Sequence, residues 1–202
     1  MRIGIDIDDT IADTYEVAFA YAQLYTIKDL GKNATVINKP SMHHSYLKEM
    51  HNWNQEEELN FWRKYYPQIL KKARPFTFAQ EIVNKLKEEE NEIIFITARW
   101  SGDNYNIEEI TRDWLKENNI IYDDVFFNIM DKGKAAKNQK LDLFIDDSFQ
   151  NCKSVANTGI KTFIIESRTN KGLKDDNITR VYSWPDIYSR IKKEESKWNF
   201  MN

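Results

Sequence analysis

The chain has 202 residues, a length that suits one domain or a core domain with a sizeable insertion. Its 29 basic and 32 acidic side chains give a net charge of −3, which argues against a protein that binds polymeric nucleic acid without sequence preference. Because Cys152 is the single cysteine and the apolar runs are too short to cross a bilayer, we expect a cytoplasmic protein without disulfides, cysteine-cluster zinc or a membrane partner.

The first predicted element is a short strand over residues 3–7. Its isoleucines form an almost continuous apolar run, which is typical of a strand buried on both faces of a parallel sheet. The run leads directly into an acidic cluster, Asp6-Ile7-Asp8-Asp9-Thr10. We therefore expect a buried strand with carboxylates at its end.

A long segment separates this strand from the next, which ends at Thr97. A strand–helix–strand unit needs only about 30–40 residues, so roughly 60 residues are surplus to the connection. The surplus is rich in aromatic residues and has several helix-length stretches, which Pro40 and Pro67 are expected to interrupt. We predict a helical cap at residues 14–76, inserted into a core domain of residues 1–13 and 77–202.

Beyond the insert, strands and helices alternate along the chain. Apolar stripes predict the helices; one stripe begins at Phe78, and Asn106 is expected to cap the helix that follows it in sequence. Gly159 is expected to end another helix. This alternation predicts a doubly wound, Rossmann-like α/β sheet. The predicted strands are 92–97, 125–129, 141–145 and 161–165; the helices are 78–89, one from Ile107, 132–140, 149–157, and 185–197, the last closing the sheet.

Polar side chains follow four of the predicted strands. Because the carboxyl ends of parallel strands meet at one edge of the sheet, we expect these side chains to lie together. Crowded carboxylates need a cation, and without thiolates or convergent histidines the expected ion is a hard one such as Mg²⁺. A lysine and a hydroxyl beside Mg²⁺ form a pocket for a phosphate. The residues concerned are Asp6, Asp8, Thr97, Lys132, Asp146 and Asp147.

The two aspartates that follow the first strand differ in position and therefore in the role that we expect of each. Asp6, at the strand tip, is placed to attack phosphorus and form an aspartyl phosphate. Asp8 lies two residues further and can protonate the leaving oxygen, then deprotonate the incoming water. This pair predicts a phosphomonoesterase.

Four motifs resemble those of the haloacid dehalogenase superfamily. Residues 6–10 resemble its first motif, Thr97 and Lys132 its second and third, and Asp146-Asp147-Ser148 its fourth. The resemblance implies a Rossmann-like core with a helical cap inserted after the first motif. Within the superfamily the chain resembles bacterial nucleotidases related to the 5′-deoxyribonucleotidase family, through the strings ITAR (96–99), IDDS (145–148) and RVYSW (180–184).

The resemblance implies a role for each matching position. Asp6 would be the nucleophile and Asp8 the acid and base, and Asp8 would also give its backbone carbonyl to Mg²⁺. Asp147 is favoured over Asp146 as the direct metal ligand beside Asp6, without excluding the reverse. Thr97 and Lys132 would hold the phosphate; the further substrate-binding candidates in these motifs are Thr10, Ala98 and Arg99.

Several of these residues have a structural alternative. Thr97 could bond the backbone at a strand end, and Arg99 could as readily pair with a surface carboxylate as contact substrate. Lys134 competes with Lys132, which we favour because it opens a helix. The histidines of the insert have no partner at metal-ligand spacing and are expected to be surface or packing residues: His43, His44 and His51.

The predicted function is therefore a Mg²⁺-dependent 5′-nucleotidase that acts on (deoxy)ribonucleoside monophosphates. Animal deoxyribonucleotidases carry Thr-Ser-Pro where this chain has Thr97-Ala98-Arg99, so a phosphatase of a sugar phosphate or another small phosphomonoester is the alternative. A receiver-type signalling domain is a remote alternative. Its phosphorylated aspartate lies on a middle strand, whereas here Asp131 lies beyond the end of that strand.

Overall fold

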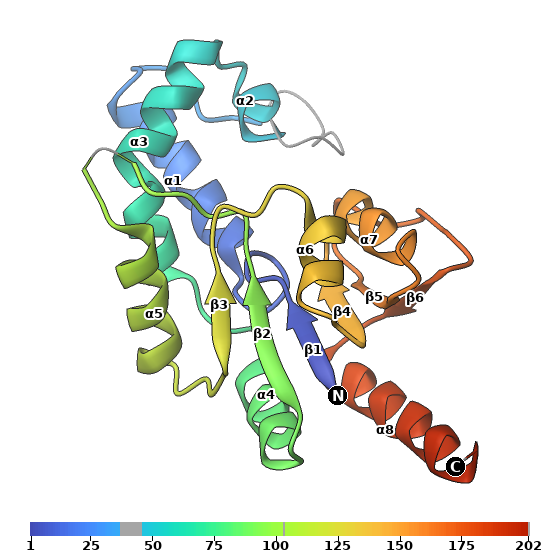
Figure 1. The fold of residues 1–202 in the computed structure, drawn as a ribbon. Coiled ribbons are helices and arrows are strands. Elements are labelled where there is room, and N and C mark those ends of the chain that lie inside the picture. Colours follow the sequence, from blue (N-terminus) through green and yellow to red (C-terminus); the bar gives the residue numbers. More distant parts are fainter. Residues whose placement is uncertain (37–45, 103, 202) are drawn as a thin grey trace.

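A parallel sheet forms the centre of the molecule (Figure 1). The computed structural model describes residues 1–36, 46–102 and 104–201, so Pro40, His43 and His44 lie outside the described residues. Among those described, six strands pair in the order β3-β2-β1-β4-β5-β6, and each neighbouring pair is parallel. The strands are β1 (Arg2–Ile5), β2 (Glu92–Ile96), β3 (Asp124–Phe126), β4 (Leu143–Asp146), β5 (Lys161–Ile165) and β6 (Ile178–Val181).

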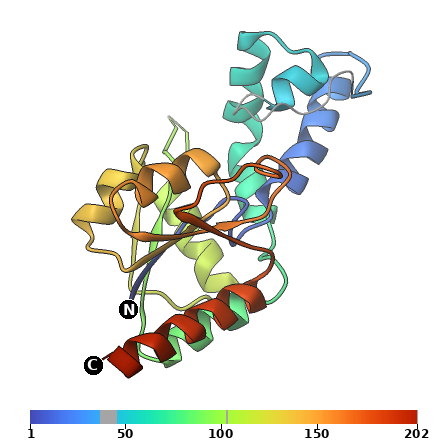
Figure 2. The same cartoon turned by 90° about the vertical axis from the view of Figure 1, so that its right-hand side faces the viewer.

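Helices cover both faces of the sheet (Figure 2). Alternate residues of β2 point to opposite faces: Ile93 and Phe95 pack in one apolar core, and Ile94 and Ile96 pack in another. This arrangement confirms the predicted doubly wound α/β fold. The first core includes residues of α4 (Ala79–Glu88), α5 (Ile107–Glu117) and α8 (Trp184–Met201); the second includes residues of α6 (Lys132–Asn138) and α7 (Phe149–Ala156).

The predicted strands coincide with observed ones, with differences at their ends. The prediction of 161–165 matches β5, whereas the prediction of 125–129 is too long, because Asn128 has a φ of 56° and turns the chain. No strand was predicted at β6. That strand carries Arg180 and lies at the sheet edge, so it lacks the continuous apolar run that marks the interior strands.

The helix predictions were also partly wrong. Asn106 caps α5 as expected, since its side chain accepts hydrogen bonds from the backbone N–H groups of Glu108 and Glu109. Phe78 is instead 53% exposed and lies before α4 in a left-handed conformation, so it is outside the apolar stripe. The helix expected to close the sheet, α8, packs on a face beside α4, while β6 forms the edge.

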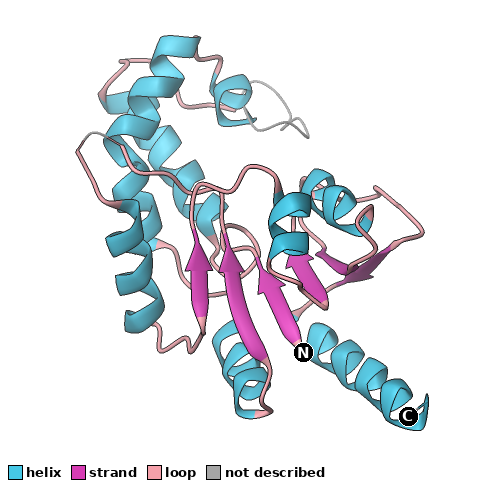
Figure 3. Cartoon of the chain, viewed as in Figure 1, coloured by secondary structure: helices cyan, strands magenta, loops and turns pink. Residues whose placement is uncertain are grey.

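Three helices of the insert stand above the carboxyl ends of the strands (Figure 3). Aromatic side chains from all three form a separate core, with Tyr25, Trp53 and Phe61 at its centre. Pro67 does not interrupt the last helix, because buried residues before and after it hold the helix in place. The helices are α1 (Thr14–Lys28), α2 (Tyr46–His51) and α3 (Gln55–Lys72).

The insert joins the rest of the chain through two adjacent connections. The backbone N–H of Asp13 donates to the carbonyl of Arg74 at 2.8 Å, and that of Phe76 donates to the carbonyl of Ile11 at 2.9 Å. A second contact is apolar, where Tyr66 and Leu70 of α3 pack with residues of α5. The division of the chain at residues 14 and 76 stays a prediction. No helix among the described residues combines the length and apolar character needed to span a membrane.

Candidate active site

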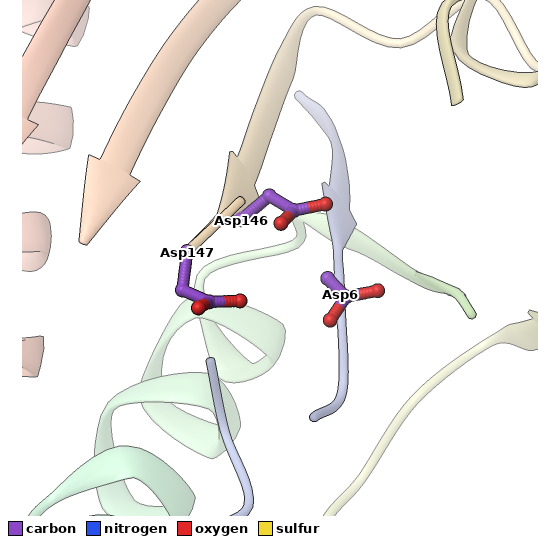
Figure 4. A group of neighbouring side chains, drawn as sticks. All are labelled: Asp6, Asp146 and Asp147. Atoms are coloured by element: carbon purple, nitrogen blue, oxygen red, sulfur yellow. The ribbon is translucent and has the colours of Figure 1, made fainter. Parts of the chain in front are cut away.

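Three carboxylates meet at the carboxyl ends of the two central strands (Figure 4). Asp6 directly follows β1, Asp146 ends β4, and Asp147 comes next. Since β1 and β4 are adjacent, the backbone N–H of Asp6 donates to the carbonyl of Ile145 at 2.9 Å. One carboxylate oxygen from each aspartate lies within 4.8 Å of the others. Sheet topology thus brings together residues about 140 positions apart in sequence.

Hydrogen bonds fix the two aspartates at the end of β4. The fully buried Asp146 accepts bonds from the backbone N–H of Ser148 at 2.7 Å and from Nδ2 of Asn151 at 3.0 Å. The backbone N–H of Asp147 donates to the hydroxyl of Thr10 at 3.0 Å. Thr10 therefore links the loop after β1 to the loop after β4, and its hydroxyl is engaged inside the protein.

The electrostatics of this group favour a bound cation. Burial raises the pKa of Asp6, and the Lys132 ammonium only partly opposes this effect. Burial, together with the charge of Asp6, raises the pKa of Asp146 to about 8. Burial and the Asp146 carboxylate raise the pKa of Asp147 well above its usual range. An all-oxygen donor set of this kind fits a hard ion such as Mg²⁺, which would stabilise the ionised forms.

Lys132 extends the carboxylate group on its other side. Its side chain is 1% exposed, and its Nζ donates to Oδ1 of Asp6 at 2.7 Å and to the carbonyl of Ile96. Asp131 caps α6 by accepting a hydrogen bond from the backbone N–H of Lys134, and Lys134 itself is exposed. Of the two candidate lysines, the structure places Lys132 at Asp6.

Asp8 lies beside this group and is held by different partners. Its side chain is 33% exposed and forms an ion pair with the fully buried Arg99. The hydroxyl of Thr14 also donates to Asp8 at 2.7 Å. Burial alone would raise the pKa of Asp8, but the Arg99 guanidinium and the Thr14 hydroxyl outweigh it, so that pKa is lowered. Asp6 and Asp8 thus have pKa values shifted in opposite directions.

The second-motif residues lie at the end of β2. Thr97 is 1% exposed, and its hydroxyl accepts a hydrogen bond from the backbone N–H of Arg99 at 3.1 Å. Ala98, between them, is half-buried. The phosphate contacts predicted for Thr10, Thr97 and Ala98 stay predictions.

Sequence reasoning missed one buried residue that supports the site. Asn170, in the loop after β5, is 1% exposed and donates from Nδ2 to the carbonyls of Asp147 at 2.7 Å and Ile165 at 2.8 Å. Arg180 of β6 donates in turn to Oδ1 of Asn170 at 2.7 Å. Nothing in the sequence marks Asn170 itself, but the RVYSW string contains Arg180 and also Trp184, whose indole N–H donates to the Thr10 carbonyl.

A cavity of about 370 Å³ opens beside Asp147. It lies between α1 and the loop after β5, where the Arg168 guanidinium is 3.1 Å from the centroid of the Tyr15 ring. Burial raises the pKa of Asp9, on its wall, to about 7. This volume is within the range of small-molecule sites. The cavity therefore leaves room for a small ligand next to the carboxylates.

Known proteins match the chain over almost its whole length. A family model described as "5' nucleotidase, deoxy (Pyrimidine), cytosolic type C protein" matches residues 1–196. A Clostridium acetobutylicum protein named a nucleotidase is 26% identical over 194 residues, which cover 96% of this chain and 94% of that protein.

Solved structures share the fold. A haloacid dehalogenase-like family hydrolase from Streptococcus pneumoniae superposes with a TM-score of 0.65 at 15% identity, covering 94% of this chain and 97% of that one. A predicted phosphoglycolate phosphatase from Haemophilus somnus gives a TM-score of 0.65 at 14% identity, with coverage of 94% and 97%. At these identities, the likeness concerns the fold alone.

Proposed function

Because the chain belongs to the 5′ nucleotidase, deoxy (pyrimidine), cytosolic type C family and is therefore a hydrolase of phosphoric monoesters, we propose that it is a Mg²⁺-dependent nucleotidase that forms an aspartyl phosphate. The family match confirms the relationship predicted from the four motifs. One observation carries the mechanistic part: the carboxylates of Asp6, Asp146 and Asp147 meet within 4.8 Å of one another, with the Lys132 ammonium on Asp6. The predicted cytoplasmic location is part of the proposal.

The proposed metal ligands are Asp6, Asp147 and the backbone carbonyl of Asp8, with Asp146 next to them. Their oxygens suit Mg²⁺, and burial without a cation raises the pKa values of the three aspartates at the strand ends. When bound, the ion would offset these negative charges and polarise the phosphoryl group of the substrate.

The proposed reaction has two steps, and Asp8 serves in both. Asp8 has to enter the first step protonated, against the lowered pKa that Arg99 and Thr14 give it. A carboxylate oxygen of Asp6 attacks phosphorus, the bond from phosphorus to the leaving oxygen breaks, and that oxygen takes the proton from Asp8. Water then attacks phosphorus and gives a proton to Asp8, and the bond from phosphorus to Asp6 breaks. Lys132 offsets charge on the phosphoryl oxygens, and phosphate and a nucleoside are released.

The proposal is tested by measuring phosphate release from nucleoside monophosphates, deoxynucleotides and sugar phosphates, with Mg²⁺ and with EDTA. We expect Mg²⁺-dependent turnover of nucleotides that varies with the base. A preference that ignores the base would favour the sugar phosphate alternative. Release of one phosphate per chain, without turnover, would favour the receiver-like alternative.

The nucleophile is tested with Asp6→Asn, which keeps the size of the side chain and removes its nucleophilic oxygen. We expect phosphate release to fall at least about 10³-fold, with an unchanged circular dichroism spectrum. Asp113→Asn, at an exposed position of α5, is the matched control and should retain full activity. Appreciable turnover by Asp6→Asn would exclude Asp6 as the nucleophile.

A further inference from the structure

Arg99 is among the largest fully buried side chains of the protein. It follows the second motif at the end of β2, a position from which a side chain could reach a phosphate. Its guanidinium instead faces Asp8. Nε donates to Oδ2 of Asp8 at 2.9 Å, and Nη2 donates to Oδ1 at 2.8 Å. These two parallel bonds form the bidentate pairing that fixes the plane of a carboxylate as well as its position.

Arg99 is itself anchored on three sides. Its Nη1 donates to the hydroxyl of Thr111, a fully buried residue of α5, at 3.1 Å. Its backbone N–H donates to the hydroxyl of Thr97, and its carbonyl accepts from the backbone N–H of Asn128 at 3.0 Å. Arg99 is therefore held rigidly, by contacts from the loop after β2, the loop after β3, and α5.

From this geometry we infer that Arg99 is a positioning residue, which holds the Asp8 carboxylate in the orientation needed for proton transfer. The inference rests on the proposed function, in which Asp8 exchanges a proton with the leaving oxygen and with water. It differs both from a substrate contact and from a pair with a surface carboxylate, the two roles that the sequence left open for Arg99. Thr111 contributes to the same positioning, since its hydroxyl accepts a hydrogen bond from Nη1, the third nitrogen of the guanidinium.

The bonding pattern also distinguishes the two oxygens of Asp8. From the described residues, Oδ1 accepts two hydrogen bonds, from Arg99 and from the Thr14 hydroxyl, whereas Oδ2 accepts one, from Nε of Arg99. A carboxylate oxygen has room for about two donors, so Oδ2 keeps a free site. The carboxylate is also the part of this ion pair that solvent reaches, with Asp8 33% exposed and Arg99 0%. Oδ2 is the oxygen we assign to proton transfer.

A direct contact between Arg99 and the phosphate would have to break this arrangement. The guanidinium has no exposed surface, and all three of its nitrogens already donate to Asp8 or Thr111. Lys132, in contrast, already lies at the Asp6 carboxylate. From this geometry we expect Lys132 to contact the phosphate. Arg99 instead holds Asp8, the group that transfers the proton.

The test compares two substrates that differ in their need for a proton, and it measures leaving-group release in a single turnover, because the second step uses Asp8 for both substrates. The alkoxide leaving group of a nucleoside monophosphate needs one, whereas the phenolate of p-nitrophenyl phosphate is stable without it. We expect Arg99→Lys, which keeps the charge but loses the fork, to lower the rate of leaving-group release from the nucleotide by about 10–100-fold and from p-nitrophenyl phosphate by less than about 3-fold. KM for both should change less than about 3-fold.

A second variant keeps the test decisive if Arg99→Lys does not fold. Thr111→Val is close in shape and removes only the bond to Nη1, so we expect the same selectivity with a nucleotide loss of about 3–10-fold. Arg180→Lys is the matched control, because it removes a second arginine fork, a partly buried one that binds Asn170 and the Leu173 carbonyl. It should affect both substrates alike.

The outcomes separate this inference from the function on which it rests. Asp8→Asn should show the same selective loss in this first step on the nucleotide; equal loss of the first-step rate on both substrates would overturn the role of Asp8 as the acid of the proposed mechanism. If Asp8→Asn is selective and both Arg99→Lys and Thr111→Val lower the two rates equally, Arg99 has only a structural role and the inference fails. A rise in KM shared by both substrates would assign Arg99 to the phosphate and would also overturn it.

Discussion

His51 lies inside the aromatic core of the insert. Its ring centroid is 5.9 Å from that of Phe19 and 5.4 Å from that of Trp53. The side chain is 2% exposed, and neither ring nitrogen has a hydrogen-bond partner among the described residues. Of the three histidines of the insert, this one is a packing residue, and burial lowers its pKa below the ordinary value of 6.5.

This environment predicts a pH-dependent stability. In the unfolded chain His51 takes up a proton near pH 6.5, whereas the folded protein resists protonation until a lower pH. The free energy of unfolding is therefore unaffected by His51 above about pH 6.5 and falls as the pH drops below that value. His51→Phe should remove this contribution and flatten the profile between pH 7 and pH 5, as measured by urea unfolding in EDTA.

The wild-type protein is the reference for that experiment, because other groups titrate equally in both chains. The difference between the two unfolding free energies isolates His51. Parallel pH profiles would contradict the prediction. A stabilisation of His51→Phe at neutral pH is also expected, since it removes two buried nitrogens that have no partner in the described part of the chain.

At the residue scale, the site was predictable where strand ends carried charge. Asp6, Asp146 and Lys132 follow apolar runs or open a helix, and sheet topology alone places such residues together. The sequence could not reveal that Arg99 faces Asp8, because both the substrate and a carboxylate offered it a partner. The role of Asn170 could not be predicted either, since it depends on the path of a loop and not on a motif.

At the scale of elements, α6 and α7 approach closely at Gly133. A Cβ atom on Gly133 would lie 2.7 Å from the carbonyl oxygen of Ser154, a separation that real structures avoid. Gly133 thus lets α6 pack against α7, and the neighbouring Lys132 reach Asp6. The glycine serves the site through the packing of two helices.

We therefore expect Gly133→Ala to shift α6 and displace the Lys132 ammonium. Overpacking of this kind costs about 1–3 kcal/mol of unfolding free energy, and we expect kcat to fall by roughly 10-fold because the phosphate loses a positioned charge. Thermal unfolding and phosphate release measure the two effects. Lys134→Ala, at an exposed position of the same helix, should change neither the unfolding free energy nor kcat. A loss of activity in that variant would make Lys134 a candidate for the phosphate-binding lysine again.

The element predictions failed where tertiary contacts override local signals. Pro67 would end an isolated helix, yet α3 continues because Phe61 and Ile69 pack in the insert core while Tyr66 and Leu70 pack toward α5. The edge strand β6 was missed because only its last residue, Val181, is fully buried. Local sequence carries little information about either contact.

At the scale of the whole molecule, the sheet has an apolar core on each face, the insert has an aromatic core of its own, and backbone connections and the packing of α3 on α5 join the two parts. The alternation of apolar runs and amphipathic stretches was enough to predict the doubly wound sheet, and the surplus of residues was enough to predict an insertion. How the insert is oriented was not predictable, because it depends on the pairing of Ile11 and Asp13 with residues 74–76 and on the packing of α3 against α5.

The central position of β1 has a consequence for synthesis. Ile3 pairs with Ile93 on one side and with Leu143 on the other. Ribosomes add roughly 5–20 residues per second, so this strand is made many seconds before its second neighbour exists. Chains that end before β4 should leave one side of β1 unpaired and be digested by protease much faster than the full-length protein; equal resistance would contradict this. β1, which lies at the centre of the finished sheet, is thus the strand that stays incompletely paired for longest during synthesis. The nascent chain has most need of a chaperone during that interval.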